Sequence, residues 1–144
     1  MIDYYTPDGV NKKDSVRFGI DNTKGVRIYH IDSRMIKREL YDSNHKNYYT
    51  IGSEVCNNAY DAAGKYMVEL IQKPGVNTFT DLDNLNVMLT KDDLFYTGDV
   101  FSMDKHSSFF INGKMDDGSD INYEIEIVST GGDEATIRIK YTSK

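Results

Sequence analysis

The chain has 144 residues, 39% of them hydrophobic and 28% charged, which indicates a folded domain with an apolar core rather than a disordered chain. Its 23 acidic and 17 basic residues give a net charge of -6, and since nucleic acids and anionic membranes bind basic surfaces, we expect neither as a partner. No apolar stretch approaches the roughly 20 residues that span a bilayer, so we expect no membrane insertion.

The first clear element is a strand predicted at residues 25–31 (GVRIYHI). Val26, Ile28 and His30 share one face, and such period-2 alternation is typical of a half-buried strand. Asp32 falls on the same face one pleat further along, where its carboxylate could accept a hydrogen bond from His30. We interpret both residues as structural, because a buried imidazole must have its nitrogens satisfied. A ligand or catalytic role is the alternative.

Two segments in the middle of the chain are less sharply defined. Residues 33–41 (SRMIKRELY) have apolar side chains at helical spacing and Ser33 in a capping position, which favours a helix. A strand is the open alternative, because the segment directly follows another strand. Residues 65–73 (KYMVELIQK) are predicted as a strand, since Pro74 and Gly75 end the segment promptly.

Further short strands are expected before the C-terminus. In residues 94–101 (LFYTGDVF), two apolar pairs flank the Thr-Gly-Asp sequence at 97–99, which favours a turn. Residues 108–112 (SFFIN) are predicted as another strand, followed by a polar loop.

The C-terminal residues predict a β-hairpin. Apolar and polar side chains alternate in residues 120–129 and again in 135–141, and the two glycines at 131–132 can take the positive φ angles of a tight turn. Strands at roughly ten-residue spacing, joined by Gly, Asn and Asp turns, indicate a two-sheet fold. We therefore predict an all-β, mainly antiparallel, β-sandwich-like domain with at most one short helix, extending over residues 1–144 as a single domain.

The histidines and the cysteine do not form a recognisable catalytic set. A zinc protease site needs two histidines one helical turn apart with a carboxylate to activate water, but His30, His45 and His106 are scattered and no HExxH sequence occurs. We expect His45 and His106, which lie in polar sequence, to be solvated. Cys56 is the one cysteine, so neither an internal disulfide nor a four-thiolate zinc cage can form. We expect no enzymatic activity from this chain.

One acidic loop has the type of ligands that calcium prefers. Asp116, Asp117 and Asp120 surround a glycine and a serine, which offers three carboxylates and a hydroxyl. The loop is shorter than an EF-hand loop and lacks its terminal glutamate. A solvated turn is therefore the favoured interpretation, and the three aspartates are weak candidates for a calcium site.

Five segments follow one another along the chain: DYYTPDGVN, GVRIYHIDSRM, YMVELIQ, LFYTGDVF and the closing pair of strands. Taken in this order, they resemble the C-terminal part of the immune inhibitor A family of secreted bacterial zinc metalloproteases. The most specific match is residues 25–32, where Gly25, His30 and Asp32 fit the family's glycine-led strand. The resemblance covers nearly the whole chain.

This resemblance implies a non-catalytic domain. Family members hold zinc on an HExxH-type helix upstream of these phrases, and this sequence lacks it. We therefore expect residues 1–144 to be a fragment of a longer chain, namely its C-terminal β domain, which supports the catalytic unit or substrate presentation. The implied partner is the catalytic domain of the same parent chain, with zinc in that domain and no cofactor in this one. The implied location is extracellular or at the cell surface.

The alternative is an independent module that binds glycan or an extracellular protein. The 11 tyrosines could supply stacking surfaces, and bound calcium could shape the acidic loop. The two hypotheses differ in one structural expectation: a domain that supports a catalytic unit should show an uncovered apolar patch where that partner packs. The sequence places the border of this patch near Tyr4, Tyr5 and Val10.

Overall fold

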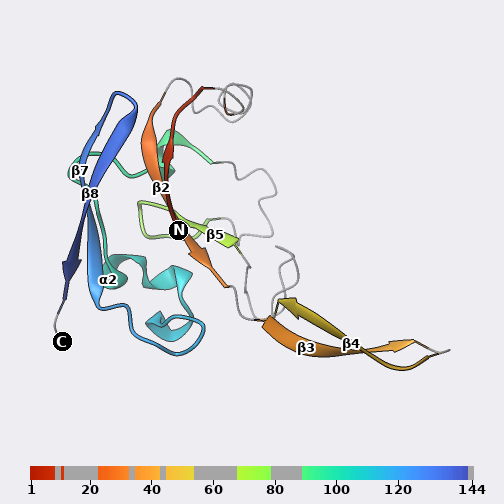
Figure 1. The fold of residues 1–144 in the computed structure, drawn as a ribbon. Helices are drawn as coiled ribbons and strands as arrows, with labels where there is room; N and C mark the ends of the chain where they lie inside the picture. The colour runs from red at the N-terminus through yellow and green to blue at the C-terminus, as the bar shows by residue number, and fades with distance from the viewer. Residues whose placement is uncertain are drawn as a thin grey trace. The chain divides into compact units, whose positions relative to one another are not determined.

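The computed structural model describes residues 1–8, 11, 23–32, 35–42, 45–53, 68–78 and 89–142, with the backbone only for 35–42 and 45–53 (Figure 1). The strands are β1 (Ile2–Tyr5), β2 (Gly25–Ile31), β3 (Met35–Asp42), β4 (His45–Ser53), β5 (Val68–Ile71), β6 (Val100–Phe101), β7 (Tyr123–Gly131) and β8 (Glu134–Tyr141). The short helical segments are α2 (Met103–His106) and the 3-10 turns η1 (Lys91–Asp93), η2 (Ser107–Phe109) and η3 (Ile111–Gly113).

Most of these strands form two three-stranded sheets, ordered β1-β2-β5 and β6-β7-β8. The pairs β1–β2, β6–β7 and β7–β8 are antiparallel. Together with the short helix α2, this arrangement confirms the predicted all-β, mainly antiparallel, two-sheet class. In the part of the chain that the structure describes, no helix is long and apolar enough to cross a membrane.

The two sheets of the first compact unit, Met1–Tyr29 with Leu70–Lys144, enclose a common apolar core. Burying one such side chain contributes about 1.5–3 kcal/mol, so this cluster is the main source of the unit's stability. Its buried members are Val26, Ile28, Ile71, Phe95, Phe101, Phe109, Phe110, Ile125 and Ile127.

The second compact unit, His30–Glu69, contains the hairpin β3–β4. The antiparallel register runs from Met35 opposite Ser53 to Asp42 opposite His45. The helix predicted for residues 33–41 is therefore wrong, and the extended alternative is confirmed over β3. Pairing with β4 satisfies the backbone groups on one edge of β3, and such tertiary contributions exceed the small differences in helix propensity. The single domain predicted over residues 1–144 stays a prediction.

The C-terminal hairpin β7–β8 is confirmed, with a modified turn. Gly131 is the last residue of β7, and only Gly132 of the glycine pair has a positive φ, +62°. A positive φ at the first of two loop residues is the pattern of a type II′ turn, whose twist matches that of paired strands. An irregularity between Ile127 and Ser129 shifts the register within β7.

Residues 108–112 do not form the predicted strand, because η2 and η3 occupy this region. Phe109 and Phe110 are both buried, 3% and 6% exposed. Adjacent residues of a strand point to opposite faces, so burying both phenylalanines in one core requires a tight turn instead. Asn112 has a φ of +54°, in the left-handed region that asparagine tolerates better than most residues.

Candidate functional site

Gly25, which begins the signature strand β2, is required by close packing. A Cβ atom at this position would lie 2.9 Å from the Cβ of Leu94 and 3.2 Å from a ring carbon of Tyr96. Leu94 is fully buried, so it cannot move aside into solvent. The glycine therefore brings β2 close to the segment that precedes β6, which is a packing role rather than a chemical one.

His30 and Asp32 are both buried, 8% and 3% exposed, and the predicted shared face of β2 is confirmed by the burial of Val26 and Ile28. His30 Nδ1 lies 4.0 Å from Oε2 of Glu69 on β5, the strand beside β2. The local sequence pattern does not predict this neighbour, because Glu69 is distant in the chain. A hydrogen bond between His30 and Asp32 stays a prediction. The arrangement is that of a buried imidazole beside a carboxylate, and the structural role of His30 and Asp32 stays a prediction.

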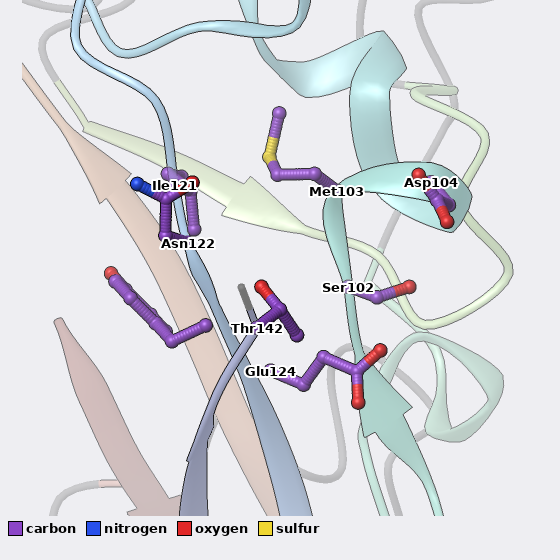
Figure 2. A pocket seen from close by; sticks show the side chains of 8 residues that line it. Ser102, Met103, Asp104, Ile121, Asn122, Glu124 and Thr142 are labelled. Atoms are coloured by element: carbon purple, nitrogen blue, oxygen red, sulfur yellow. The ribbon is translucent and has the colours of Figure 1, made fainter. Parts of the chain in front are cut away.

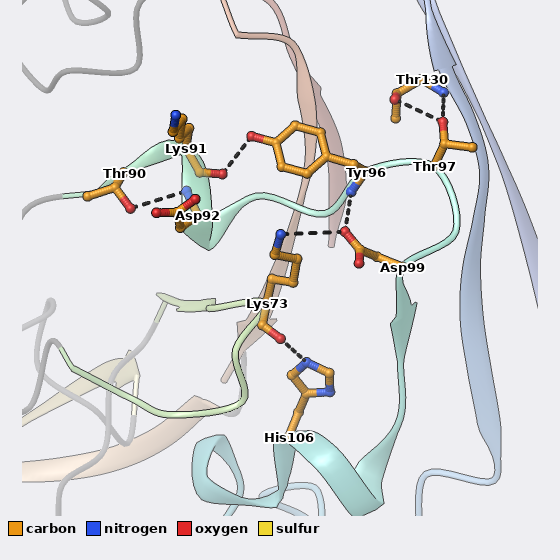
Figure 3. Close-up of polar contacts among 9 residues, drawn as sticks. All are labelled: Lys73, Thr90, Lys91, Asp92, Tyr96, Thr97, Asp99, His106 and Thr130. Atoms are coloured by element: carbon orange, nitrogen blue, oxygen red, sulfur yellow. Dashed lines mark hydrogen bonds and ion pairs between the residues drawn. The ribbon is translucent and has the colours of Figure 1, made fainter.

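His106 corrects the expectation of a solvated histidine, because it is fully buried at the end of α2. Its ring lies between Phe95 and Phe101, with centroid distances of 5.5 and 5.2 Å. Nε2 is 3.2 Å from the carbonyl oxygen of Lys73 (Figure 3). Nδ1 is 3.0 Å from the carbonyl oxygen of Ser102. The imidazole thus joins α2 to the turn after β5. His45 begins β4, and its side chain lies outside the described residues, as does Cys56.

Burial lowers the pKa of His106 below its usual value of 6.5, although the hydrogen bonds to Ser102 and Lys73 act in the opposite direction. A neutral imidazole has one N–H donor and one nitrogen acceptor. With the proton on Nε2, the ring donates to the Lys73 carbonyl, and Nδ1 accepts from the backbone N–H of Ser102 at 3.3 Å. Both ring nitrogens then have partners, so His106 is a packing residue with satisfied polar atoms.

The turn inside the phrase LFYTGDVF is held by side chains, and the turn predicted at 97–99 is confirmed. Gly98 has a φ of +90°, and Asp99 Oδ2 accepts a hydrogen bond from the backbone N–H of Tyr96 at 2.7 Å. Lys73 Nζ lies 3.8 Å from the same carboxylate and 4.9 Å from the centre of the Tyr96 ring (Figure 3). Burial, followed by nearby aspartates, raises the pKa of Tyr96, so its protonated hydroxyl donates to the Lys91 carbonyl at 2.6 Å. These contacts are structural.

A second polar network joins the end of β5 to η1. Gln72 and Asp93, 2% and 7% exposed, are linked by a hydrogen bond from Nε2 to Oδ1 of 2.7 Å. Gln72 Oε1 accepts from the backbone N–H of Thr78 at 2.7 Å, and Asp93 Oδ2 accepts from that of Thr90 at 2.7 Å. The second contact completes a capping box at η1. The network fixes the β5 turn against the segment that leads into β6.

The acidic loop does not gather its three aspartates around one point. Asp117 Oδ1 accepts a hydrogen bond from the backbone N–H of Ser119 at 2.9 Å, and Asp120 lies 3.5 Å from Nζ of Lys114. Among the described residues, no group of three or more His, Cys, Asp or Glu side chains is placed to hold a metal. Two of the three carboxylates therefore contact groups of the loop itself, and the calcium site and the solvated turn both stay predictions.

An uncovered apolar surface lies at the end of the β7–β8 hairpin. Tyr123 pairs with Tyr141, and the buried Ile125 pairs with Ile139. Residues opposite each other in an antiparallel pair share a face, so all four side chains belong to the face that covers the core. The core ends at Ile125: Tyr123, Ile139 and Tyr141 are 39%, 61% and 80% exposed. We call these three residues the hairpin end.

The patch expected near Tyr4, Tyr5 and Val10 is not found at the two tyrosines. Tyr5 is 2% exposed, and Tyr4 packs against the main core. Adjacent residues of β1 point to opposite faces, so Tyr4 packs against the main core and Tyr5 packs with Leu94 in a second apolar cluster. Val10 lies outside the described residues. The hairpin end, in contrast, lies near the C-terminal end of the described residues.

A pocket of about 220 Å³ adjoins the hairpin end. It is lined by residues 102–104 at the start of α2, residues 121–124 at the start of β7, and Thr142 after β8 (Figure 2). Tyr123 belongs to both the hairpin end and the pocket. Asp104 and Glu124 give the pocket a negative charge, whereas Met103 and Ile121 supply apolar walls. The sequence did not predict this pocket, because its three segments are far apart in the chain.

Comparisons with known proteins leave the chain without assigned relatives. No family model matches it, no curated protein matches it, and no solved structure matches it. The resemblance to the immune inhibitor A family therefore rests on the sequence phrases alone. The hairpin end and its adjoining pocket are the features from which a function can be argued.

Proposed function

We propose that this chain is a non-catalytic β domain that binds a protein partner through the hairpin end. The observation that carries the proposal is the exposure of Tyr123, Ile139 and Tyr141 on the face that elsewhere covers the core. An exposed apolar surface that contains aromatic side chains is typical of protein interfaces. Exposed tyrosines are favourable there, because they bury a large area on binding and lose little conformational freedom.

The sequence resemblance supplies the class of partner. We propose that the partner is the catalytic domain of a secreted or cell-surface bacterial zinc metalloprotease, in the same parent chain, and that this domain supports that catalytic unit or substrate presentation. Zinc would belong to the partner, and the chain itself would hold no cofactor. His106 is buried and hydrogen-bonded, and Gly25 allows close packing against Leu94. Both observations support structural rather than catalytic roles for these two residues.

An antibody against this chain tests the assignment. The native protein would be sized in the culture medium, at the cell surface and inside the cell, and the precipitated protein would be assayed for casein hydrolysis that a zinc chelator abolishes. We expect a species much larger than 16.5 kDa outside the cell, with chelator-sensitive activity. The purified chain alone should show no such activity. A native species of 16.5 kDa inside the cell would contradict the assignment.

A second candidate is an independent glycan-binding module. The observation that favours it is the cross-strand pair of Tyr123 and Tyr141, whose exposed rings could stack on a sugar. A calcium-stabilised form of this module predicts a higher melting temperature in millimolar calcium, because a ligand that binds only the folded state stabilises it. Binding of neutral oligosaccharides that is lost in Tyr141→Ser would favour this candidate over the protein-binding one.

A further inference from the structure

We infer that the partner segment that docks on the hairpin end carries a lysine or arginine, which enters the adjoining acidic pocket. This inference rests on the proposed protein-binding function and adds the chemistry of the partner. It follows from three features: the continuity of the hairpin end with the pocket, the absence of a cation beside the pocket carboxylates among the described residues, and the apolar walls next to them.

The hairpin end and the pocket form one surface because β7 contributes to both. Successive residues of a strand point to opposite faces, so Tyr123 points to the face of the hairpin end and Glu124 to the other face. Both nevertheless line the pocket, which lies where β7 enters the sheet. Thr142, directly after Tyr141, lines the same pocket. A segment that crosses Tyr141 and Tyr123 is therefore adjacent to the pocket at Tyr123 and Thr142.

The basic side chains of β8 pair with a glutamate outside the pocket. Lys140 is directly opposite Glu124 in the register, but its Nζ lies 2.7 Å from Glu126. Arg138 also pairs with Glu126, at 3.1 Å. Within the ranges that the structure describes, neither Glu124 nor Asp104 forms an ion pair. Arg138 and Lys140 thus both pair with Glu126. As far as the described residues show, the carboxylates of Asp104 and Glu124 stay available to a cation of the partner.

The shape and lining of the pocket suit a long basic side chain. Lysine and arginine have apolar stems and charged ends, so they can bury the stem against apolar surface and keep the charge among polar groups. Met103 and Ile121 would contact the stem, and the carboxylates of Asp104 and Glu124 would contact the charge (Figure 2). Charge complementarity of this kind selects partners and increases the association rate.

Amide NMR with two matched peptides tests the inference on the 144-residue chain. The probes are acetyl-Leu-Arg-Leu-Arg-Leu-amide and acetyl-Leu-Glu-Leu-Glu-Leu-amide, each titrated to millimolar concentration. We expect the basic peptide to shift the amide signals of residues 121–124 and 139–142, and the acidic peptide to leave them unchanged. The double variant Asp104→Asn with Glu124→Gln should bind the basic peptide roughly threefold to tenfold more weakly, as expected for two partly exposed ion pairs.

The control is the double variant Asp92→Asn with Glu134→Gln, which makes the same change in net charge at two exposed sites outside the pocket. It should bind the basic peptide as the unmodified chain does. Equal loss of binding in both double variants would overturn the inference, because net charge alone would then explain it. Equal shifts by both peptides would also overturn it, but would leave apolar docking at the hairpin end intact. No shift by either peptide would overturn it as well, and position-specific cross-linking to the native partner would then decide the proposed function separately.

Discussion

At the scale of single residues, Gly25 shows how one position fixes the spacing between two segments. Substitution Gly25→Ala places a methyl group 2.9 Å from Leu94, which is fully buried. Overpacking of this kind costs about 1–3 kcal/mol. We expect the free energy of unfolding, measured by urea denaturation, to fall by that amount.

Gly131→Ala is the matched control, because nothing lies within 4 Å of the added Cβ and the residue has no positive φ. It should leave the unfolding free energy unchanged or raise it by about 0.5–1 kcal/mol. If both alanine variants lost stability equally, backbone flexibility rather than the contact with Leu94 would be the cause.

His106 predicts a loss of stability toward acid. Its pKa in the folded chain is below 6.5, so the unfolded state binds more protons, and stability must fall as the pH decreases from about 6.5 toward the folded pKa. Titration of the ring proton by NMR should give a midpoint below 6.5. In His106→Phe, the part of the pH dependence that falls in this window should disappear. A midpoint above 6.5 would show that the hydrogen bonds to Lys73 and Ser102 outweigh the effect of burial.

Sequence alone could find some buried polar residues and not others. His30 was predicted on the apolar face of a strand because its neighbours alternate with period 2. His106 has the polar neighbours Lys105 and Ser107, so the local pattern indicated solvent. Its burial depends on Phe95 and on the Lys73 carbonyl, which are distant in the chain, and no local pattern reports such contacts.

At the scale of elements, the Gln72–Asp93 network predicts a large loss of stability when Asp93 is substituted. The surrounding sequence KDD is polar and by itself would indicate an exposed segment. Asp93→Ala would remove one acceptor of the buried Gln72 amide and the acceptor of the Thr90 backbone N–H. Thr90 is exposed, so water can replace the second contact, whereas the buried Gln72 N–H would lose its partner. An unsatisfied buried group costs about 1–3 kcal/mol, and we expect the unfolding free energy to fall by that amount. The neighbouring control Asp92→Ala, at an exposed position, should change it by less than about 0.5 kcal/mol.

Elements were predictable where periodicity and turn chemistry agree. The β7–β8 hairpin combines strict alternation with a glycine turn, and both appear in the structure. Residues 108–112 have β-favouring phenylalanines but no alternation, and the need to bury two adjacent rings produced 3-10 turns instead. Residues 33–41 had helical spacing, yet the described part of this segment, from residue 35, lies in β3 and pairs with the strand that follows it.

At the scale of the whole molecule, folding and binding are expected to use different parts of one sheet face. Ile127 is fully buried in the core, so the substitution Ile127→Ala should lower the unfolding free energy by about 2–5 kcal/mol. Ile139→Ser and Tyr141→Ser, at 61% and 80% exposure, should each change the unfolding free energy by less than about 0.5 kcal/mol. Large destabilisation by either serine variant would mean that the hairpin end serves the fold rather than a partner.

The two-sheet architecture could be inferred from the sequence, but the site could not. Alternation shows which side chains share a face, and it cannot show where the core beneath that face ends. Tyr141 and Ile137 occupy equivalent positions in the pattern, yet only Ile137 packs against the core. The pocket likewise requires segments that meet only in the folded chain.

Photo-cross-linking from position 141 tests the central claim, protein binding through the hairpin end, most directly. The native protein would be produced in its source organism with Tyr141→p-benzoylphenylalanine, and cross-linked peptides would be identified by mass spectrometry. Val76, which is 61% exposed and lies in the turn region after β5, provides the control position. We predict cross-links from position 141 to one defined protein surface, that of a zinc metalloprotease catalytic domain, and none from position 76. Equal labelling from both positions, or no product from position 141, would contradict the account.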